Sequence, residues 1–329
     1  MASQNRKPDI SNSNQFNKEP KTKNKIIYAI LVTILSAIAL ITGRYSVSES
    51  EENQTTQQDQ AVTLADAEFQ VHVIDVGQGD SILICADGET MLIDAAESKS
   101  GTKILDYLAS RNVTQLDYAA ATHMHADHIG SFSKVLEQIR PAHVIEPIFS
   151  DSVTPTTKTY EKYLDAVEAT GAEYTAMQAG DSFTLGNAQI TVLAPVDESA
   201  KDLNNTSLVF RIQYDDIVCL FTGDMEVQEE KTILENPENQ GLLKATFLKA
   251  GHHGSDTSSS EDFLAQVQPE YVAVSCGVNN KYGHPAQSTL DHLAVWTDQI
   301  YITAQQGDIV FYYDKDTKSS HIMASGKES

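Results

Sequence analysis

THMHADHIGS, residues 122–131, places three histidines and an aspartate close together, at His123, His125, Asp127 and His128. The stretch follows an apolar run that predicts a strand, so histidines two positions apart can point to the same side of a turn. Asp127 and His128 then fall at the start of the next helix, where the helix dipole favours a negative charge. Imidazole nitrogens with a carboxylate suit zinc or, with more oxygen donors, manganese. The turn therefore predicts a metal site.

Metal-capable side chains also follow three later predicted strands. Asp224 ends the run LFTGD, His252 and His253 follow FLKAG, and His284 lies in NKYGHP. Each alone is weak evidence, because a Gly-Asp pair usually forms a turn and a single loop histidine is usually only solvated. Taken with the histidine-rich turn they converge, since strand-end loops at one edge of a pair of sheets can meet at one place. We expect these residues to complete the site.

Strand and helix patterns alternate from Phe69 onward, and the alternation repeats after a middle stretch. The expected strands cover 69–76, 81–86, 90–96 and 116–122 in the first half, and segments near 182–194, 207–213, 217–224, 245–251 and 273–277 in the second. The expected helices cover 103–111, 134–139, 158–169 and the segment around Glu229. Two such halves predict an α/β fold in which two sheets pack face to face with helices outside.

Composition limits the classes of function. The chain has 329 residues and a formal net charge of -23, from 46 acidic and 23 basic side chains. Such a surface repels phosphate backbones, which argues against a simple nucleic-acid-binding module unless metals or a basic patch reverse it locally. Cys85, Cys219 and Cys276 are scattered through apolar runs. They predict buried side chains, not a disulfide framework or a cysteine metal site.

The N-terminal segment predicts export. IIYAILVTILSAIALITG, residues 26–43, carries no charge and is long enough to cross the hydrocarbon of a bilayer. Lysines gather before it and acidic residues follow it, so residues 1–25 are expected as a disordered cytoplasmic tail and residues 44–68 as a flexible stalk outside. The expected location is the cell membrane, single-pass, with an extracellular domain. Ala37 and Ala39 form an AxA-like cleavage site after a short apolar core. The alternative is therefore a signal peptide that is cleaved, which would release a secreted domain.

The HxHxDH pattern at 123–128 resembles the signature of the metallo-β-lactamase superfamily, and within it the chain resembles the extracytoplasmic hydrolase domain of ComEC-type competence proteins. The resemblance also rests on HVIDVGQGDSILI, NNTSLVF, FTGD, LKAGHHGS and NKYGHP, in that order. It covers roughly residues 69–313 and extends to exported phosphorylcholine esterases. It implies an αββα sandwich over 69–314 with one or two metal ions, Zn²⁺ or Mn²⁺, and it leaves 315–329 as a polar C-terminal tail.

Carried over position by position, the resemblance implies two cation sites that share one carboxylate. The implied donors are His123 and His125 for the first cation, Asp127, His128 and either His252 or His253 for the second, and Asp224 as the bridge. Asp127 would also orient the attacking water, and His284, with Tyr282, would donate a hydrogen bond or a proton to the substrate. Asp75 and Asp80 in DVGQGD are expected either to hold imidazole N–H groups or to form a structural turn.

One departure from the superfamily pattern concerns the first cation. Its third histidine normally lies between the HxHxDH turn and the GD strand, where this chain has only His143, on a predicted strand. The segment NNTS, with Asn204 and Asn205, occupies that region instead. Because an amide oxygen is a weaker ligand than an imidazole, we expect the first site to be weakly filled or to prefer manganese.

The predicted chemistry is metal-assisted hydrolysis of a phosphoester. Three functions stay open: a nuclease or phosphodiesterase acting on nucleic acid, an esterase acting on phosphoryl groups of a cell-wall polymer, and a non-catalytic metal-binding sensor. The membrane is an expected partner through the anchor. Lactam hydrolysis is not expected, because no motif indicates a lactam pocket, and a chain this acidic offers no evident basic pocket for glutathione.

Overall fold

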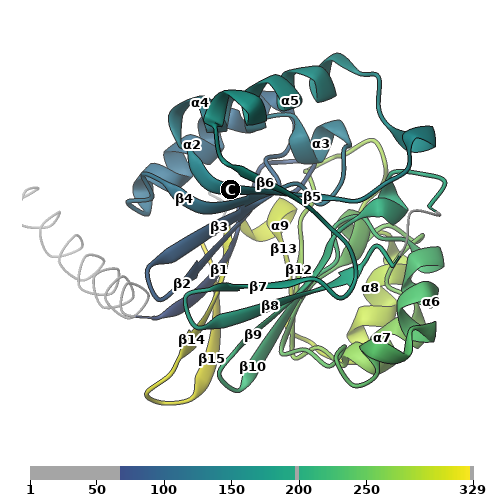
Figure 1. Cartoon of the computed structure of the whole chain (residues 1–329). Coiled ribbons are helices and arrows are strands. Elements are labelled where there is room, and N and C mark those ends of the chain that lie inside the picture. Colours follow the sequence, from purple (N-terminus) through teal and green to yellow (C-terminus); the bar gives the residue numbers. More distant parts are fainter. Residues whose placement is uncertain (1–66, 197–199, 327–329) are drawn as a thin grey trace, which may run out of the picture. The chain divides into compact units, whose positions relative to one another are not determined.

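Residues 67–196 and 200–326, the part of the chain that the computed structural model describes, form two packed β-sheets with helices on their outer faces (Figure 1). The predicted α/β sandwich is confirmed. None of the helices in these two ranges has the length and apolar character needed to span a bilayer. The expected tail (1–25), the expected anchor (26–43) and the expected stalk up to residue 66 lie outside the described residues.

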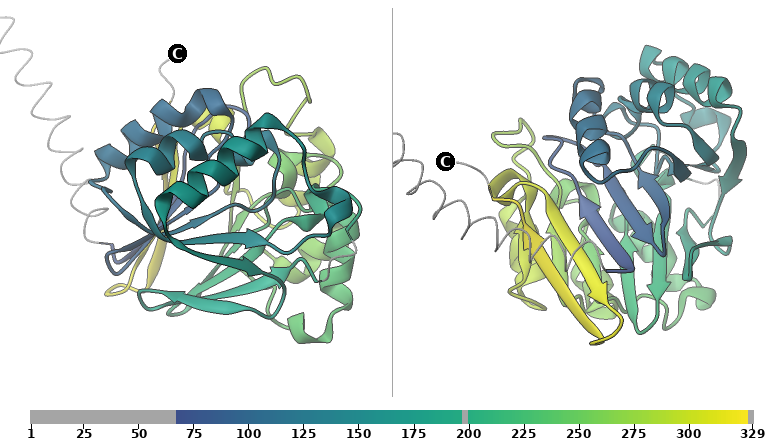
Figure 2. Two further views of the ribbon diagram at one scale, coloured as in Figure 1. Left: turned by 45° about the horizontal axis from the view of Figure 1, so that its top comes forward. Right: turned by 90° about the vertical axis from the view of Figure 1, so that its left-hand side faces the viewer.

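The first sheet has eight strands and the second has seven. From edge to edge, the first sheet contains β15 (Ser319–Ala324), β14 (Ile309–Asp314), β1 (Phe69–Val73), β2 (Ile82–Ala86), β3 (Glu89–Ile93), β4 (Leu116–Ala120), β5 (Pro141–Pro147) and β6 (Glu173–Met177). The second contains β13 (Ile300–Ile302), β12 (Tyr271–Val274), β11 (Phe247–Lys249), β10 (Ile217–Phe221), β9 (Val209–Tyr214), β8 (Ala188–Ala194) and β7 (Ser182–Leu185). Figure 2 shows β14 and β15 beside β1 and β2, so the C-terminal strands complete the sheet that the first half begins.

The alternation within β2 shows how the core is divided. Ile82, Ile84 and Ala86 pack between the two sheets, whereas Leu83 and Cys85 face the outer helices. Successive side chains of a strand point to opposite faces, so a strand that is covered on both sides needs apolar residues at every position. Each fully buried Ile or Leu contributes about 2 kcal/mol, and both interfaces are built largely from such residues.

The helices form one layer on each outer face. The first sheet is covered by α2 (Gly101–Ser110), α4 (Phe132–Gln138) and α5 (Lys158–Thr170), and the second by α6 (Val227–Glu235), α7 (Glu261–Val267) and α8 (Gln287–Ala294). Two one-turn helices, α3 (Ala126–Ile129) and α9 (Thr303–Gln306), and the 3-10 turns η1 (Ser98–Ser100), η2 (Asp151–Val153), η3 (Asn204–Thr206), η4 (Pro237–Asn239) and η5 (Gly251–Gly254) lie in the connections. The expected helix at 158–169 is confirmed: the Thr157 side chain accepts a hydrogen bond from Tyr160 N, and Gly171, with φ 68°, ends it.

The predicted polar tail at 315–329 contains a strand over 319–324. β15 pairs antiparallel with the whole of β14, from Asp314 opposite Ser319 to Ile309 opposite Ala324. Ile322 packs against the core between the sheets. An edge strand with one exposed face needs few apolar residues, so SSHIMA carries too weak a pattern to stand out. The domain therefore extends beyond residue 314.

Parallel pairing determines where the site lies. The strands β3 to β6 are parallel to one another in the first sheet, and so are β10 to β13 in the second. Loops at the carboxyl ends of parallel strands emerge at one edge, which is where ligand sites form in α/β sheets. The loops after β4, β10, β11 and β12 carry the predicted donors.

Candidate metal centre

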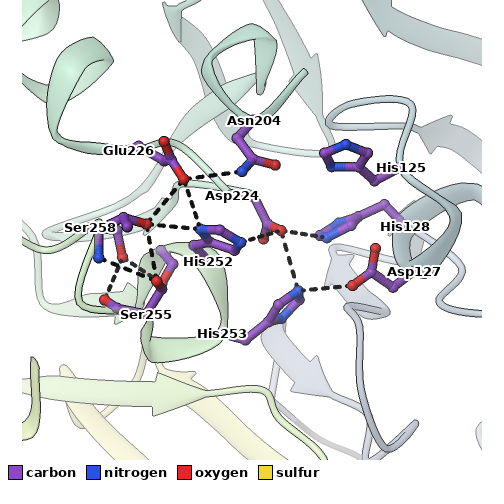
Figure 3. Close-up of polar contacts among 12 residues, drawn as sticks. His125, Asp127, His128, Asn204, Asp224, Glu226, His252, His253, Ser255 and Ser258 are labelled. Atoms are coloured by element: carbon purple, nitrogen blue, oxygen red, sulfur yellow. Dashed lines mark hydrogen bonds and ion pairs between the residues drawn. The ribbon is translucent and has the colours of Figure 1, made fainter. Parts of the chain in front are cut away.

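The predicted metal-capable residues meet where the two sheets present their strand ends (Figure 3). The histidine-rich turn follows β4 of the first sheet, whereas Asp224 follows β10, and His252 and His253 follow β11, of the second. A cavity of about 330 Å³ opens beside them and is lined by Gln78, His125, Ala126, Asp127, Asn204, Asp224, His252, His253, Tyr282 and His284. Loops from both sheets therefore supply one site.

Asp224 lies at the centre of this cluster. The residue is 2 % exposed, and its Oδ2 lies 3.1 Å from His128 Nε2 and 3.3 Å from His253 Nε2. The Nε2 atoms of His252 and His123 lie 3.7 Å and 3.9 Å from the same oxygen. Four imidazoles from two turns thus point at one carboxylate, the arrangement expected of a residue that bridges two cations.

Asp94, which the sequence analysis missed, holds His128 from behind. His128 Nδ1 lies 2.7 Å from Asp94 Oδ2, and both side chains are buried. Asp94 also accepts hydrogen bonds from Thr122 N at 2.8 Å and from Thr122 Oγ1 at 2.7 Å. A carboxylate behind a ligating imidazole fixes its tautomer and orientation, so Nε2 is directed at Asp224. The only signal in the sequence is one acidic residue inside the apolar run at 90–96.

Asp80 and Lys249 form a similar support behind His253. His253 Nδ1 lies 3.1 Å from Ser275 O and 3.2 Å from Asp80 Oδ1. Lys249 Nζ lies 2.7 Å from Asp80 Oδ2, and both residues are buried. Burial alone raises the pKa of Asp80, but the Lys249 ammonium and His253 lower it to about 2. Asp80 therefore takes the imidazole-holding role that was one of its two expected roles, whereas the buried Lys249 was not foreseen.

The DVGQGD turn packs directly beneath α3. Gly79 has φ 110°, and a Cβ atom there would lie 2.2 Å from the Asp127 carbonyl oxygen. That oxygen accepts a hydrogen bond from Asp80 N at 3.2 Å. Asp75 shapes the turn, because its carboxylate lies 3.3 Å from Lys103 Nζ and accepts a hydrogen bond from Gly77 N. The structural alternative for Asp75 is thus favoured.

The turn that carries His252 and His253 is strained. Both residues adopt the left-handed region, with φ 46° and 56°. A non-glycine residue pays roughly 1 kcal/mol or more for this conformation, which occurs mainly where function requires it. The kink directs the Nε2 atoms of both histidines toward Asp224.

The outer side of the site is formed by His123 and His125. His123 Nε2 lies 3.0 Å from His125 Nδ1, while His123 Nδ1 faces the hydroxyls of Thr122 at 3.2 Å and Ser207 at 3.3 Å. Burial lowers the pKa of both imidazoles, so both are neutral at pH 7. Neutral imidazoles carry the lone pairs that a cation needs. Asn204 lies next to this pair and lines the same cavity.

The donor set fits a divalent cation. Asp224 Oδ1, His128 Nε2 and His253 Nε2 are buried and have no hydrogen-bond partner among the described residues. Buried polar atoms are nearly always paired, so these atoms indicate a missing partner. Asp80, Asp94 and Asp224 are three buried carboxyl groups, whereas Lys249 is the one buried lysine or arginine within residues 67–196 and 200–326. Burial opposes protonation of His128, yet the Asp224 and Asp94 carboxylates raise its pKa well above the usual value, so the surrounding charges favour a positive charge at this position.

Among the described residues, four sets of three side chains are close enough to hold an ion, and two of these sets consist entirely of predicted metal donors. The ligand atoms of Asp127, His128 and His253 lie within 4.8 Å of one another, as do those of His123, His128 and Asp224. The first set favours His253 over His252 as the donor that joins Asp127 and His128. His252 is held on the other side of Asp224, with its Nδ1 3.3 Å from Glu226 Oε1. Glu226 is a further residue that the sequence analysis missed.

His284 and Tyr282 line the cavity. Their rings stack at a centroid distance of 5.6 Å, and the His284 ring lies 5.6 Å from that of His252. Burial and the neighbouring histidines lower the pKa of His284. Tyr282 is 54 % exposed, so its side chain is accessible to a molecule that enters the cavity.

His143 does not join the cluster. It lies in β5, where its ring stacks on Tyr118 at 4.8 Å and its Nδ1 lies 3.5 Å from Glu173. The third histidine of the superfamily pattern therefore has no replacement from this position. Asn204 lines the cavity, whereas Asn205 is buried and its Oδ1 accepts a hydrogen bond from Glu226 N.

Comparison with known proteins gives relatives of the kind expected. ComE operon protein 3 of Bacillus subtilis is 31% identical over 265 residues, which cover 75% of this chain and 33% of that protein. Recombination protein 2 of Haemophilus influenzae is 28% identical over 254 residues, covering 75% of this chain and 29% of that protein. The chain thus spans about a third of the length of these relatives.

Solved structures and family profiles agree with the fold. A mutant of the β-hydroxylase CmlA superposes with a TM-score of 0.50 at 10% sequence identity, over 74% of this chain and 54% of that one, which supports the fold alone. Residues 74–278 match the metallo-beta-lactamase superfamily. The chain therefore belongs to the metallo-β-lactamase superfamily, with a domain homologous to part of the competence proteins.

Proposed function

We propose that the chain is a metal-dependent hydrolase that cleaves phosphoester bonds. The observation that carries the proposal is the Asp224 carboxylate, surrounded by four imidazole Nε2 atoms at 3.1 to 3.9 Å and buried with an unpaired Oδ1. A divalent cation bound there supplies Lewis acidity, which activates water and offsets the charge of a phosphate. Both Zn²⁺ and Mn²⁺ accept a mixed set of imidazole and carboxylate donors.

The protein's own side chains would handle the water and the leaving group. Asp127 lines the cavity, and although burial opposes its ionisation, the imidazole of His253, whose Nε2 lies 3.5 Å from Asp127 Oδ2, holds the pKa of Asp127 below its usual range. An ionised Asp127 accepts a hydrogen bond from water and so orients it for attack. His284 and Tyr282, at the rim of the same cavity, can donate hydrogen bonds to a substrate oxygen.

Nucleic acid is the substrate that we favour. The support is the similarity to competence proteins, together with a cavity that is open to solvent at Tyr282. The net charge of -23 opposes binding of a phosphate backbone, but bound cations reverse the local sign. A larger hollow of about 850 Å³ beside α6 and α7 is lined by no histidine, so it offers no comparable chemistry.

The test of hydrolysis uses bis-(p-nitrophenyl) phosphate and the purified chain with Zn²⁺, with Mn²⁺ and with a chelator. We expect cation-dependent release of nitrophenol that is lost in His123→Ala. The matched control is His143→Ala, which removes a histidine that lies outside the cluster. If His123→Ala hydrolyses the ester as fast as the control, the proposed function is wrong.

The substrate is tested separately. The chain is incubated with single-stranded DNA and with choline-bearing teichoic acid, and fragments and released phosphorylcholine are measured. Cleavage of DNA alone supports the nuclease, whereas release from teichoic acid alone assigns the chain to cell-wall esterases. Binding of cations without turnover of either polymer points to a sensor.

We also propose that residues 26–43 anchor the chain and leave the hydrolase domain outside the cell. The support is the uncharged apolar run and the lysines that precede it. Protease added to intact cells is expected to remove the domain while the chain fractionates with membranes. A full-length chain that resists protease until the cells are broken would contradict this orientation.

A further inference from the structure

The loop over residues 277–284, between β12 and α8, is held in shape by Asn280. Asn280 Nδ2 donates hydrogen bonds to the carbonyl oxygens at the two ends of the loop, Gly277 O at 2.9 Å and His284 O. Asn280 Oδ1 accepts hydrogen bonds from Tyr282 N at 3.2 Å and from His284 N at 2.9 Å. The first end also packs closely, because a Cβ atom at Gly277 would lie 2.9 Å from Gln78 N. The loop therefore presents its side chains on a backbone that is already ordered.

Two large apolar side chains of this loop are exposed beside the cavity. Val278 is 59 % exposed and Tyr282 is 54 % exposed, and Tyr282 lines the cavity. Seven large hydrophobic side chains are exposed in the part of the chain that the structure describes, so this short loop carries a share far above its length. Exposed apolar side chains next to a cavity are typical of a surface that binds another molecule.

Lys281 adds a positive charge at the same place. Its Nζ lies 4.8 Å from the centre of the Tyr282 ring, a distance at which an aromatic ring attracts a cation. Lys281 takes part in none of the lysine–carboxylate pairs formed within residues 67–196 and 200–326. In a chain with a net charge of -23, an ammonium without a carboxylate neighbour is available to an anionic ligand.

We propose that this loop binds a single-stranded nucleic acid beside the phosphate that is cleaved. Lys281 pairs with the neighbouring phosphate, and the exposed parts of Tyr282 and Val278 contact the base between the two phosphates. The inference rests on the proposed function and adds the element that recognises the polymer. Proteins commonly hold single strands by this combination of a cation for the backbone and an aromatic ring for a base. A duplex keeps its bases stacked inside, so it offers no base to Tyr282.

The position of Lys281 separates a polymer from a small ester. Lys281 lies outside the lining of the cavity, whereas the residues beside the metal centre form that lining. A small ester has a single phosphate, which a bound cation accepts. A polymer has further phosphates that extend past the cavity, and Lys281 can contact one of these. Loss of Lys281 should therefore weaken the polymer more than the small ester.

The experiment compares the two kinds of substrate with the purified full-length chain and Mn²⁺. Hydrolysis is followed with bis-(p-nitrophenyl) phosphate and with fluorescein-labelled oligothymidine. The anisotropy of the oligomer, read before cleavage, gives its affinity at several salt concentrations. The variants are Lys281→Ala, Lys281→Arg, Tyr282→Phe and Tyr282→Ala. The control is Lys244→Ala, which alters an exposed lysine on the hollow beside α6 and α7. Circular dichroism establishes that each variant is folded.

We expect Lys281→Ala to weaken oligothymidine binding by about three- to fivefold, the worth of one exposed ion pair. The slope of log affinity against log salt should become shallower by about 0.7, because one phosphate contact is lost. Lys281→Arg should restore both values. Tyr282→Ala is expected to weaken binding by about tenfold through the lost base contact, whereas Tyr282→Phe keeps the ring and the affinity. A duplex of the same length should bind less tightly than oligothymidine.

The inference is overturned if Lys281→Ala keeps the affinity and the salt slope of the wild type, or if Lys244→Ala loses as much. Cation-dependent hydrolysis of the small ester would then leave the proposed function standing. A wild-type chain that hydrolyses neither substrate would overturn the proposed function, and the anisotropy would still decide the inference. Teichoic acid, which has phosphates but no bases, is added as a competitor. Displacement of oligothymidine with equal strength per phosphate would overturn the assignment to nucleic acid.

Discussion

The two sides of Asp224 are built differently. On the inner side, His128 and His253 are at most 1 % exposed, and the second nitrogen of each ring faces a buried acceptor, Asp94 for one and Ser275 with Asp80 for the other. On the outer side, His123 is buried, but His125 and His252 are half-buried. There the supporting contacts come from hydroxyls, those of Thr122 and Ser207 for His123 and that of Thr257 for His252, and from the partly exposed carboxylate of Glu226.

This difference separates two tasks. Donors whose rings are fixed by buried partners keep their positions whatever occupies the site, which suits a tightly held cation. Donors beside an open cavity can exchange water for a substrate oxygen, which suits the cation that meets the substrate. The inner side therefore acts as the rigid half of the site and the outer side as the adjustable half.

Removing the charge of Asp224 is expected to have the largest effect on hydrolysis, because the donors on both sides of the site face this carboxylate. Asp224→Asn keeps the size of the side chain but withdraws the carboxylate that four imidazoles face. A loss of about 4 kcal/mol of transition-state stabilisation corresponds to about a thousandfold slower hydrolysis. The measurement is kcat/KM for bis-(p-nitrophenyl) phosphate, with the exposed Asp216→Asn as the control.

A smaller effect, confined to the inner side, is expected from Asp94→Asn. The substitution weakens the contact with His128 Nδ1 without touching the cavity. Loss of such a supporting carboxylate typically lowers metal affinity 10- to 100-fold. Calorimetry should therefore show one weakened site and one nearly unchanged site, and Asp106→Asn, on the exposed face of α2, should leave both unchanged. Equal weakening of both sites would contradict the division into two halves.

The sequence predicts the donors better than it predicts their supports. The HxHxDH spacing and the strand-end positions of Asp224 and His253 carry a chemical meaning that one short segment can reveal. Asp94 and Lys249 lie inside apolar runs, and their partners are 34 and 169 positions away, at His128 and Asp80. No local sequence pattern predicts such pairs, because the two residues of each pair come together only when the sheets fold.

Backbone conformation is a second feature that could not be predicted from the sequence. The choice between His252 and His253 depends on two successive left-handed residues, a geometry that non-glycine residues rarely adopt and that the sequence GHHG does not specify. The edge strand β15 was missed for another reason, since none of its residues is fully buried and few of them are large and apolar. The two-sheet fold was predictable because strands covered on both sides, such as β2 (ILICA), are mostly apolar.

The support beneath the inner side can be tested through Gly79. An alanine there places its Cβ atom 2.2 Å from the Asp127 carbonyl oxygen at a backbone φ of 110°. We expect Gly79→Ala to lower the free energy of unfolding by about 3 kcal/mol, since it combines a backbone clash with strain. Gly77→Ala is the matched control, because its φ is 80° but no atom lies within 4 Å of the added Cβ. It should cost only about 1 kcal/mol in urea unfolding with chelator present.

The smallest expected effect is on the pH dependence of stability and comes from His72, a buried histidine outside the metal centre. Burial, and then the charge of Arg111, lower the pKa of His72 to about 3, in contrast with His128, whose carboxylate partners raise its pKa. Because the folded-state pKa lies below the unfolded value of about 6.5, His72 contributes stability above pH 6.5 that is lost as the pH falls toward 3.

The slope of this loss is at most about 1.4 kcal/mol per pH unit. His72→Gln keeps a polar side chain between Tyr107 and Gln70 but does not titrate. Urea unfolding at pH 7, 6, 5 and 4 with chelator present should therefore give a shallower decline for His72→Gln than for the wild type. His321→Gln, at an exposed position of β15, should follow the wild type. Parallel declines in all three proteins would mean that the neutral state of His72 carries no part of the acid sensitivity.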